Sequence, residues 1–202
     1  VTGTSYQLLL SGSPVGSAVA GTGSAISFGL ITTGGSYTVL ATIGATGCTS
    51  AMSGTATVVV NPLPTVFTVT GGGAYCLGGT GVAIGLNGST SGVNYQLMNG
   101  STPMGAPVAG TGTSISFGLQ TTTGSYTVVA TNATTGCIAN MFGSVSVSTS
   151  SLPIAFNVTG GGNFCLGGTG VAVGLSGSST GTTYQLFNGA TLIGAAGGTG
   201  GA

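Results

Sequence analysis

The chain has 202 residues, 43 of them glycine, and it contains no Asp, Glu, Lys, Arg or His. General acid–base catalysis, activation of serine nucleophiles, and zinc or calcium binding rely largely on these missing side chains. The composition therefore argues against an enzyme and predicts no cofactor and no metal site. Because Lys and Arg supply most of the affinity for phosphates, we expect no nucleic-acid partner either.

The same composition still predicts a folded protein. Val, Ile, Leu, Tyr and Phe recur at regular spacing along the chain, whereas disordered segments are poor in β-branched and aromatic residues. No apolar run approaches the roughly 18 residues that a membrane span requires. We therefore expect a folded chain without a membrane span.

The chain repeats itself along its length. The stretch "GGGAYCLGGTGVAIGL" at residues 71–86 returns as "GGGNFCLGGTGVAVGL" at residues 160–175. The tripeptide "YQL" occurs three times, beginning at Tyr6, Tyr95 and Tyr184. Successive copies are 89 residues apart, which is too long for solenoid units of about 20–50 residues and fits one small sandwich domain per repeat.

Two proline-containing segments mark the expected joints between repeats. These are "NPLPT" at Asn61–Thr65 and "SSLPI" at Ser150–Ile154, where proline removes a backbone donor and stops sheet pairing. On this division residues 65–153 form one complete module. Residues 1–61 form the C-terminal part of the preceding module, and residues 154–202 form the N-terminal part of the next.

Within residues 65–153 the apolar residues alternate with small or polar ones, which is typical of β-strands. In chain order the expected strands contain "TVFTVT", "VAIGL", "YQLM", "ISFGL", "YTVVA" and "GSVSVST". The residues expected to point inward are Val82, Ile84, Leu86, Tyr95, Leu97, Ile115, Phe117, Leu119, Tyr126, Val128, Ala130, Val145 and Val147. No stretch has a helical period, so we predict an antiparallel sandwich in which each strand buries one apolar face.

The glycines of residues 71–86 have two possible interpretations. A phosphate-binding loop requires G-x-G-x-x-G at the start of a helix. Here Gly79-Thr80-Gly81 is followed by Ile84 at the position of the third glycine, and no helix is expected after it. We interpret these glycines as turn residues that supply positive φ angles and allow close backbone approach.

Each module carries one early and one late cysteine. Cys76 and Cys165 are early, Cys48 and Cys137 are late, and no C-x-x-C pair suggests a metal site. The pattern predicts disulfides and an oxidising, extracytoplasmic setting. The pair within the complete module is Cys76–Cys137, and Cys48 and Cys165 would have partners outside the window. In an immunoglobulin strand order the two positions fall at opposite ends, so a bridge between stacked neighbouring modules is the alternative.

The chain resembles a known family at these residues. "YCLGGTGVAIGL" (75–86), "YQLMNG" (95–100) and "GSYTVVATNATTGC" (124–137), followed by a last strand and a proline joint, are similar to the immunoglobulin-like repeats of giant Bacteroidota cell-surface proteins, the adhesin and gliding-associated repeats. The resemblance implies tandem immunoglobulin-like antiparallel β-sandwich modules with an 89-residue repeat. It also implies secretion to the cell surface. Tyr37 and Tyr126 resemble the tyrosine corner of such sandwiches, a structural role.

Two functions of different classes follow. The first is a structural repeat region of a secreted or cell-surface protein that forms an extracellular fibre or stalk, with neighbouring repeats and copies of itself as partners. Its outward strand positions are small and uncharged, so we expect lateral packing that salt barely affects. The alternative is an adhesin module that binds glycans or surfaces. Its first candidate contacts are the recurring glutamines Gln7, Gln96 and Gln185.

Overall fold

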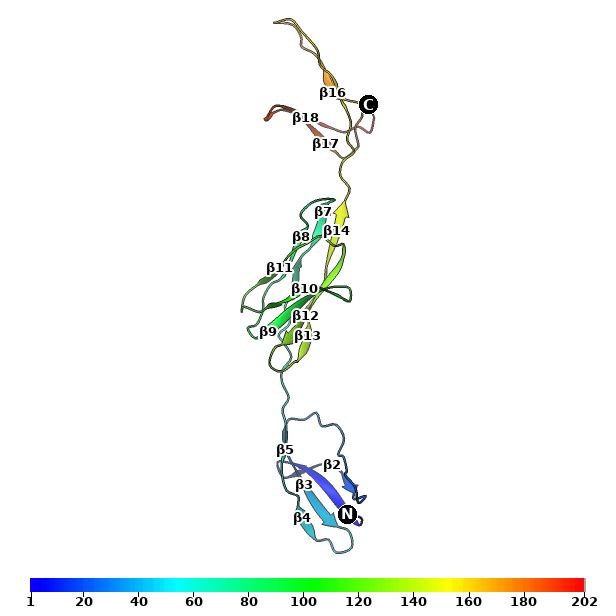
Figure 1. The fold of residues 1–202 in the computed structure, drawn as a ribbon, viewed down its shortest axis with the longest axis vertical. Coiled ribbons are helices and arrows are strands. Elements are labelled where there is room, and N and C mark those ends of the chain that lie inside the picture. The colour runs from blue at the N-terminus through cyan, green and yellow to red at the C-terminus, as the bar shows by residue number, and fades with distance from the viewer. Residues whose placement is uncertain (202) are drawn as a thin grey trace.

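The computed structural model describes residues 1–201, and within them it is all-β, with eighteen strands and no helix. Strand pairing gives five sheets. They form three groups, which follow one another along the long axis of the molecule (Figure 1). We call them the first unit (β1–β5), the middle unit (β6–β14) and the third unit (β15–β18). Nothing in the described residues forms a helix of the length and apolarity needed to cross a membrane.

The first unit is a single antiparallel sheet. Its strands are β1 (Thr4–Leu10), β2 (Ser13–Ala20), β3 (Gly35–Ile43), β4 (Thr49–Ala51) and β5 (Ala56–Val58). They are arranged in the order β2-β1-β3-β4, and β5 pairs with the beginning of β3. The sheet buries Leu8, Tyr37 and Ala41, but no second sheet covers its apolar face.

The middle unit has two sheets. Its strands are β6 (Val69–Gly71), β7 (Gly73–Cys76), β8 (Val82–Leu86), β9 (Val93–Asn99), β10 (Thr102–Ala109), β11 (Ile115–Gln120), β12 (Gly124–Asn132), β13 (Ile138–Asn140) and β14 (Val145–Ser150). One sheet has the order β10-β9-β12-β14-β7, with β13 also on β12, and the other has the order β11-β8-β6. All pairs are antiparallel except β14 with β7.

A continuous apolar core lies between these two sheets, which gives the middle unit a β-sandwich-like fold. The buried core consists of Val69, Ile84, Leu86, Val93, Tyr95, Leu97, Ile115, Tyr126, Val128, Ala130, Met141 and Val147. Both sheets contribute to it, so neither sheet can bury its face alone. Because burying one large apolar side chain is worth about 1.5–3 kcal/mol, this set supplies most of the favourable free energy of the unit.

The glycines after β6 let the first part of the middle unit change sheets. Gly71, Gly72 and Gly73 all have positive φ, at 91°, 74° and 127°. A Cβ on Gly71 would collide with the carbonyl oxygen of Ala83, and one on Gly72 would lie 2.8 Å from the carbonyl oxygen of Ser146. Strand β6 pairs with β8 and strand β7 pairs with β14, so the chain passes from one sheet to the other within these three glycines. The interpretation of these glycines as residues that supply positive φ angles and allow close backbone approach is confirmed.

The predicted alternation is correct for most of the core and wrong at Leu119. Ile115 is buried as expected, but Leu119 is 58% exposed. The register of β11 against β8 shifts between Ser116 and Leu119, at Gly118, whose φ is 77°. This β-bulge inserts one extra residue and reverses the alternation, so Leu119 pairs with the outward Ala83 instead of entering the core. Phe117, Val82 and Val145, also expected inside, are only partly buried at the edge of the core.

The third unit consists of two separate hairpins. Strands β15 (Val158–Gly160) and β16 (Val173–Leu175) form one, and β17 (Thr183–Asn188) and β18 (Thr191–Gly197) form the other. No strand pairing joins the two hairpins. They are connected by an edge-to-face contact between the rings of Phe156 and Tyr184, whose centroids are 6.5 Å apart. The hydroxyl of Ser178, after β16, also donates to the carbonyl oxygen of Gly201 and accepts from the backbone N–H of Thr199.

Candidate interaction surface

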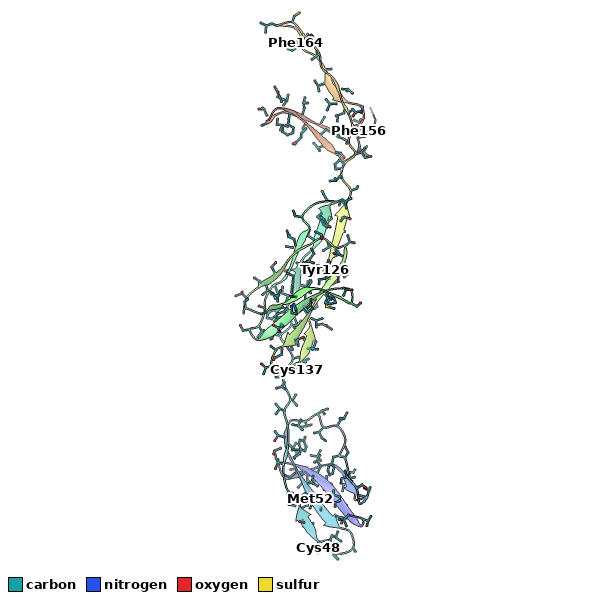
Figure 2. The ribbon with its side chains drawn as sticks, in the orientation of Figure 1. Cys48, Met52, Tyr126, Cys137, Phe156 and Phe164 are labelled. Atoms are coloured by element: carbon teal, nitrogen blue, oxygen red, sulfur yellow. The ribbon has the colours of Figure 1, made fainter. Side chains whose placement is uncertain are left out.

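The four cysteines are free thiols in this structure. Cys76 ends β7, where it is in register with Ser150 at the end of β14. Cys137 lies at the opposite end of the middle unit, facing the first unit, with its Sγ 3.9 Å from the carbonyl oxygen of Asn61 (Figure 2). The structure therefore does not bring Cys76 and Cys137 together, and the pairing within one module has no support from the geometry.

Two of the three recurring glutamines use their side-chain amides inside their own hairpins. The Nε2 of Gln96 donates to the carbonyl oxygens of Met104 (3.2 Å) and Gly105 (3.3 Å). The Nε2 of Gln7 donates in the same way to the residues at the equivalent positions of β2. Because the strand register shifts at these points, the amide replaces a missing ladder donor. This geometry favours a structural role for Gln7 and Gln96, whereas Gln185 is exposed.

The two corner tyrosines make the hydrogen bond that their position predicts. The hydroxyl of Tyr126 donates to the carbonyl oxygen of Thr122 (2.7 Å), and that of Tyr37 donates to Thr33 (2.8 Å). Both rings are buried. Each hydroxyl thus ties the start of a central strand to the preceding turn, which is a structural use of the side chain.

The first unit leaves an apolar groove open beside residues 24–28. The groove is lined by Val1, Tyr6, Ser24, Ala25, Ile26, Phe28, Val39 and Met52. Residues 25–32 have no strand partner, and the side chain of Leu30 is fully exposed. One face of the sheet and this segment together form an open apolar surface.

The third unit leaves a second apolar groove open between its two hairpins. Its lining includes Val158, Val173 and Leu175 from the first hairpin, and Tyr184 and Leu186 from the second. Val158 is 72% exposed and Val173 is 47% exposed. The hairpin β15–β16 and the residues that flank it extend over residues 155–178. It presents an apolar face with no sheet opposite.

One edge of the middle unit is protected against strand addition. Strand β10 is the outer strand of its sheet, and it carries Pro103 and Pro107. Proline cannot donate to a further strand, and a bulge between Met104 and Val108 also disturbs this edge. Proline and the bulge therefore protect this edge without any charged side chain. On the flat faces of the two sheets the exposed residues include Ala83, Ser116, Thr127, Ser144 and Ser146.

The open grooves were not found by sequence reasoning, although the sequence contains a signal for them. In the middle unit "ISFGL" follows a "VAIGL" strand that becomes its partner. In the first unit "ISFGL" has no "VAIGL" before it, and in the third unit "VAVGL" has no "ISFGL" after it. The first unit thus contains only the second segment of this strand pair, and the third unit contains only the first segment. The middle unit contains both.

No protein-family model, no curated protein and no solved structure matches the chain. Within residues 1–201 there is also no cluster of three or more Cys residues or other ligand side chains that could hold a metal ion.

Proposed function

We propose that this chain is a structural repeat region of a secreted or cell-surface protein, in which immunoglobulin-like modules pack end to end and side by side into an extracellular fibre or stalk. The observation that carries the proposal is the succession of three similar strand groups along one axis (Figure 1). Such an array can extend without any catalytic or ligand-binding centre.

Strand registers support a common module. Tyr6 pairs with Ala41 in the first unit, and Tyr95 pairs with Ala130 in the middle unit. Both partners are displaced by 89 residues, which is the sequence period. In the third unit, Val158 pairs with Leu175 as Val69 pairs with Leu86.

The third unit departs from the period at one place. Strand β18 has seven residues where β10 has eight. Gly198 consequently takes the place of Gly110: a Cβ on either glycine would collide with the carbonyl oxygen of the same loop residue, Ser179 or Thr90. The deletion lies in an edge strand, so the central pairs keep their register.

The strand order supports an immunoglobulin-like module. Strands β6, β8 and β11 take the places of A, B and E in one sheet, and β9, β12 and β14 those of C, F and G in the other. Strand β10 corresponds to the additional C′ strand of variable-type domains, next to β9. The buried Tyr126 near the start of β12 lies at the tyrosine-corner position of strand F.

The absence of charge favours packing over ligand recognition. Several outward positions of the middle unit, such as Ala83, Ser116 and Thr127, carry small side chains that allow flat faces to approach closely. No outward position carries a charge that would keep copies apart. The adhesin alternative depends on exposed amides or aromatic rings, yet Gln7 and Gln96 use their amides internally. A fibre or stalk is therefore the better-supported role.

Electron microscopy of the purified chain tests the proposal directly. We expect filaments or laterally associated rods with a periodic repeat along their length. Separate particles at all concentrations would contradict it.

Limited proteolysis tests the modules independently of assembly. We expect early cleavage near residues 61–65 and 150–154, because these segments connect the three strand groups and contain no strand residue apart from Ser150 at the end of β14. Cleavage spread evenly through the strands would contradict the division into modules.

A further inference from the structure

We propose that the parallel strand pair of the middle unit, β7 with β14, is a mechanical clamp that resists tension along the chain. The inference rests on the proposed function, in which modules packed end to end carry load, and both strands lie inside the complete module. The middle unit is connected to the first unit through residues 61–65 and to the third unit through residues 150–154. Tension along the molecule therefore enters the middle unit at one end of its chain and leaves at the other.

The segment that receives load from the first unit runs parallel to the segment that passes load to the third unit. Residues 67–77 contain β6 and β7, and residues 142–150 contain β14. The two segments meet first at the parallel bridge between Thr68 and Phe142, and again along the whole of β7. Figure 1 shows β7 and β14 side by side at the end of the middle unit that faces the third unit.

The parallel direction decides how tension acts on this pair. Load is applied at the N-terminal end of residues 67–77 and at the C-terminal end of β14, so the two segments are pulled in opposite directions along their length. The hydrogen bonds between them lie across the load and share it. In an antiparallel hairpin the same two ends lie together, and load opens the bonds one after another. A sheared pair fails only when several bonds break at once, which raises the force required.

Alternate residues of β14 carry the bonds to β7. The backbone N–H of Leu77 donates to the carbonyl oxygen of Ser150 (2.9 Å), so the backbone groups of Ser150 face β7. Successive residues of a strand direct their backbone groups to opposite sides. Ser148 therefore faces β7 as well, and Thr149 faces away. Load on β14 passes to β7 through residues such as Ser148 and Ser150.

Strand β7 is itself tied to the other sheet of the unit. The hydroxyl of Tyr75 donates to the carbonyl oxygen of Thr121, which follows β11. The loop after β7 also lies against the end of β11, because a Cβ on Gly81 would be 2.5 Å from the carbonyl oxygen of Gln120. These contacts keep β7 with the second sheet while β14 is pulled toward the third unit, so the load acts on the bonds between β7 and β14.

The other end of the load path is held in the same direction. The backbone N–H of Val69 donates to the carbonyl oxygen of Phe142 (3.0 Å), and the N–H of Phe142 donates to that of Phe67 (2.8 Å). These bonds join the entering segment to the residues that lead into β14, and tension shears them together with the β7–β14 pair. The chain from the first unit meets them before any strand of the middle unit.

Failure of the clamp would open the core. Val147 of β14 is 2% exposed, and Tyr126 of the neighbouring strand β12 is fully buried. Removal of β14 uncovers both side chains, and neither sheet buries its apolar face without the other. We therefore expect the middle unit to unfold under tension in one step, as soon as β14 separates from β7.

Single-molecule stretching of the 202-residue chain tests the clamp by changing only the direction of load. The chain carries Cys48→Ser, Cys137→Ser and Cys165→Ser in both arms. In one arm force is applied through tags at the two termini, which shears β7 against β14. In the other arm force is applied between Cys76 and the C-terminal tag. Cys76 is exposed and in register with Ser150, so this direction pulls the two strand ends apart and opens the bonds one at a time.

The expected result is a difference in force between the two arms. Load through the termini should unfold the middle unit in one step that releases about 250–300 Å of chain, since each of residues 65–150 extends by about 3.3–3.6 Å. At the same loading rate, the force in the Cys76 arm should be about half of this or less, because forced unfolding depends on the barrier to unfolding rather than on equilibrium stability. Equal forces in the two arms would overturn the inference.

A matched pair of proline variants locates the clamp. Ser148→Pro removes an N–H that faces β7, whereas Thr149→Pro removes one that faces away, and both residues are exposed. Under constant force through the termini, Ser148→Pro should raise the unfolding rate about tenfold or more and Thr149→Pro less than about threefold. Tyr75→Phe keeps the ring, removes only the bond to Thr121, and should raise the rate about threefold. Equal rates in the two proline variants, or no effect of Tyr75→Phe, would contradict the clamp.

The outcomes separate this inference from the proposed function. A high, direction-dependent unfolding force in a chain that never forms filaments supports the clamp and contradicts the fibre. Filaments whose modules unfold at the same force in both directions leave the fibre proposal standing and contradict the clamp.

Discussion

The sequence "ISFGL" occurs in the first unit at residues 26–30 and in the middle unit at residues 115–119, and the two copies adopt different structures. In the middle unit it begins strand β11 and Ile115 is 8% exposed. In the first unit it forms no strand and Leu30 is fully exposed. The difference is that the middle unit contains β8, which pairs with this segment, whereas the first unit has no equivalent strand. Identical local sequence becomes a strand only where its partner is available.

The same lesson applies to the two valine-rich copies of β8. Strand β8 extends over five residues, whereas β16 has three. The middle copy pairs with a strand on each side, β11 and β6, and it packs on the opposite sheet. The third-unit copy pairs with β15 alone. Edge pairing and loss of the facing sheet therefore shorten the strand and expose its side chains.

The largest expected effect is the loss of stability when a core side chain of β8 is truncated, compared with the equivalent truncation in β16. Ile84→Ala should lower the free energy of unfolding of the middle unit by about 2–5 kcal/mol, because it leaves a cavity in a closed core. Val173→Ala removes a half-exposed side chain from an open face and should cost less than about 1 kcal/mol. Hydrogen exchange in β9 and β12 during urea titration measures the first, and exchange in β15 and β16 measures the second. Equal losses would mean that the two sheets of the middle unit do not depend on each other.

The next largest effect concerns Gly71, where the chain passes from one sheet of the middle unit to the other. Gly71→Ala should destabilise the middle unit by about 3 kcal/mol, since it adds backbone strain at φ 91° to a collision with Ala83. Gly78→Ala is the matched control: its φ is 82°, but its Cβ would meet nothing within 4 Å. We expect a loss of about 1 kcal/mol for that variant. Thermal unfolding followed by circular dichroism compares them, and equal losses would show that the close approach at Gly71 is unimportant.

A smaller effect should be the same in both units. Tyr126→Phe and Tyr37→Phe each remove one hydroxyl that donates to a carbonyl oxygen four residues earlier. Each should cost about 1 kcal/mol, because the hydrogen bond is local and does not require the second sheet. Hydrogen exchange at β12 and β3 provides the two values. A much larger loss at Tyr126 would show that the corner depends on the closed core.

The smallest expected effect is that of salt. The chain has no charged side chain, so self-association has no ion pairs for salt to screen. Sedimentation of the assembled chain should be unchanged from low to about 1 M NaCl, whereas urea should disperse it. Release of single chains by moderate salt would show that charged contacts hold the assembly.

Several features of the fold could be predicted from the sequence because they depend on local or strictly periodic signals. Alternation predicted the inward positions of Tyr95, Leu97, Tyr126 and Val128, which are at most 1% exposed. Glycine runs predicted turns and close backbone approach, since no other residue tolerates those φ angles without strain. The missing charges predict a structural role, and that role stays a prediction.

What only the tertiary structure decided depends on partners that are distant in sequence. The bulge at Gly118 turned Leu119 outward, although its sequence alternates as in a regular strand. The parallel pairing of β7 with β14 placed Cys76 and Cys137 at opposite ends of the middle unit. Sequence spacing alone could not choose between a disulfide within one module and a disulfide between neighbouring modules. The open faces of the first and third units became evident only from the strand pairing, which shows which segments have a partner and which have none. Strand pairing and burial are properties of two segments together, and a single segment does not encode whether its partner is present.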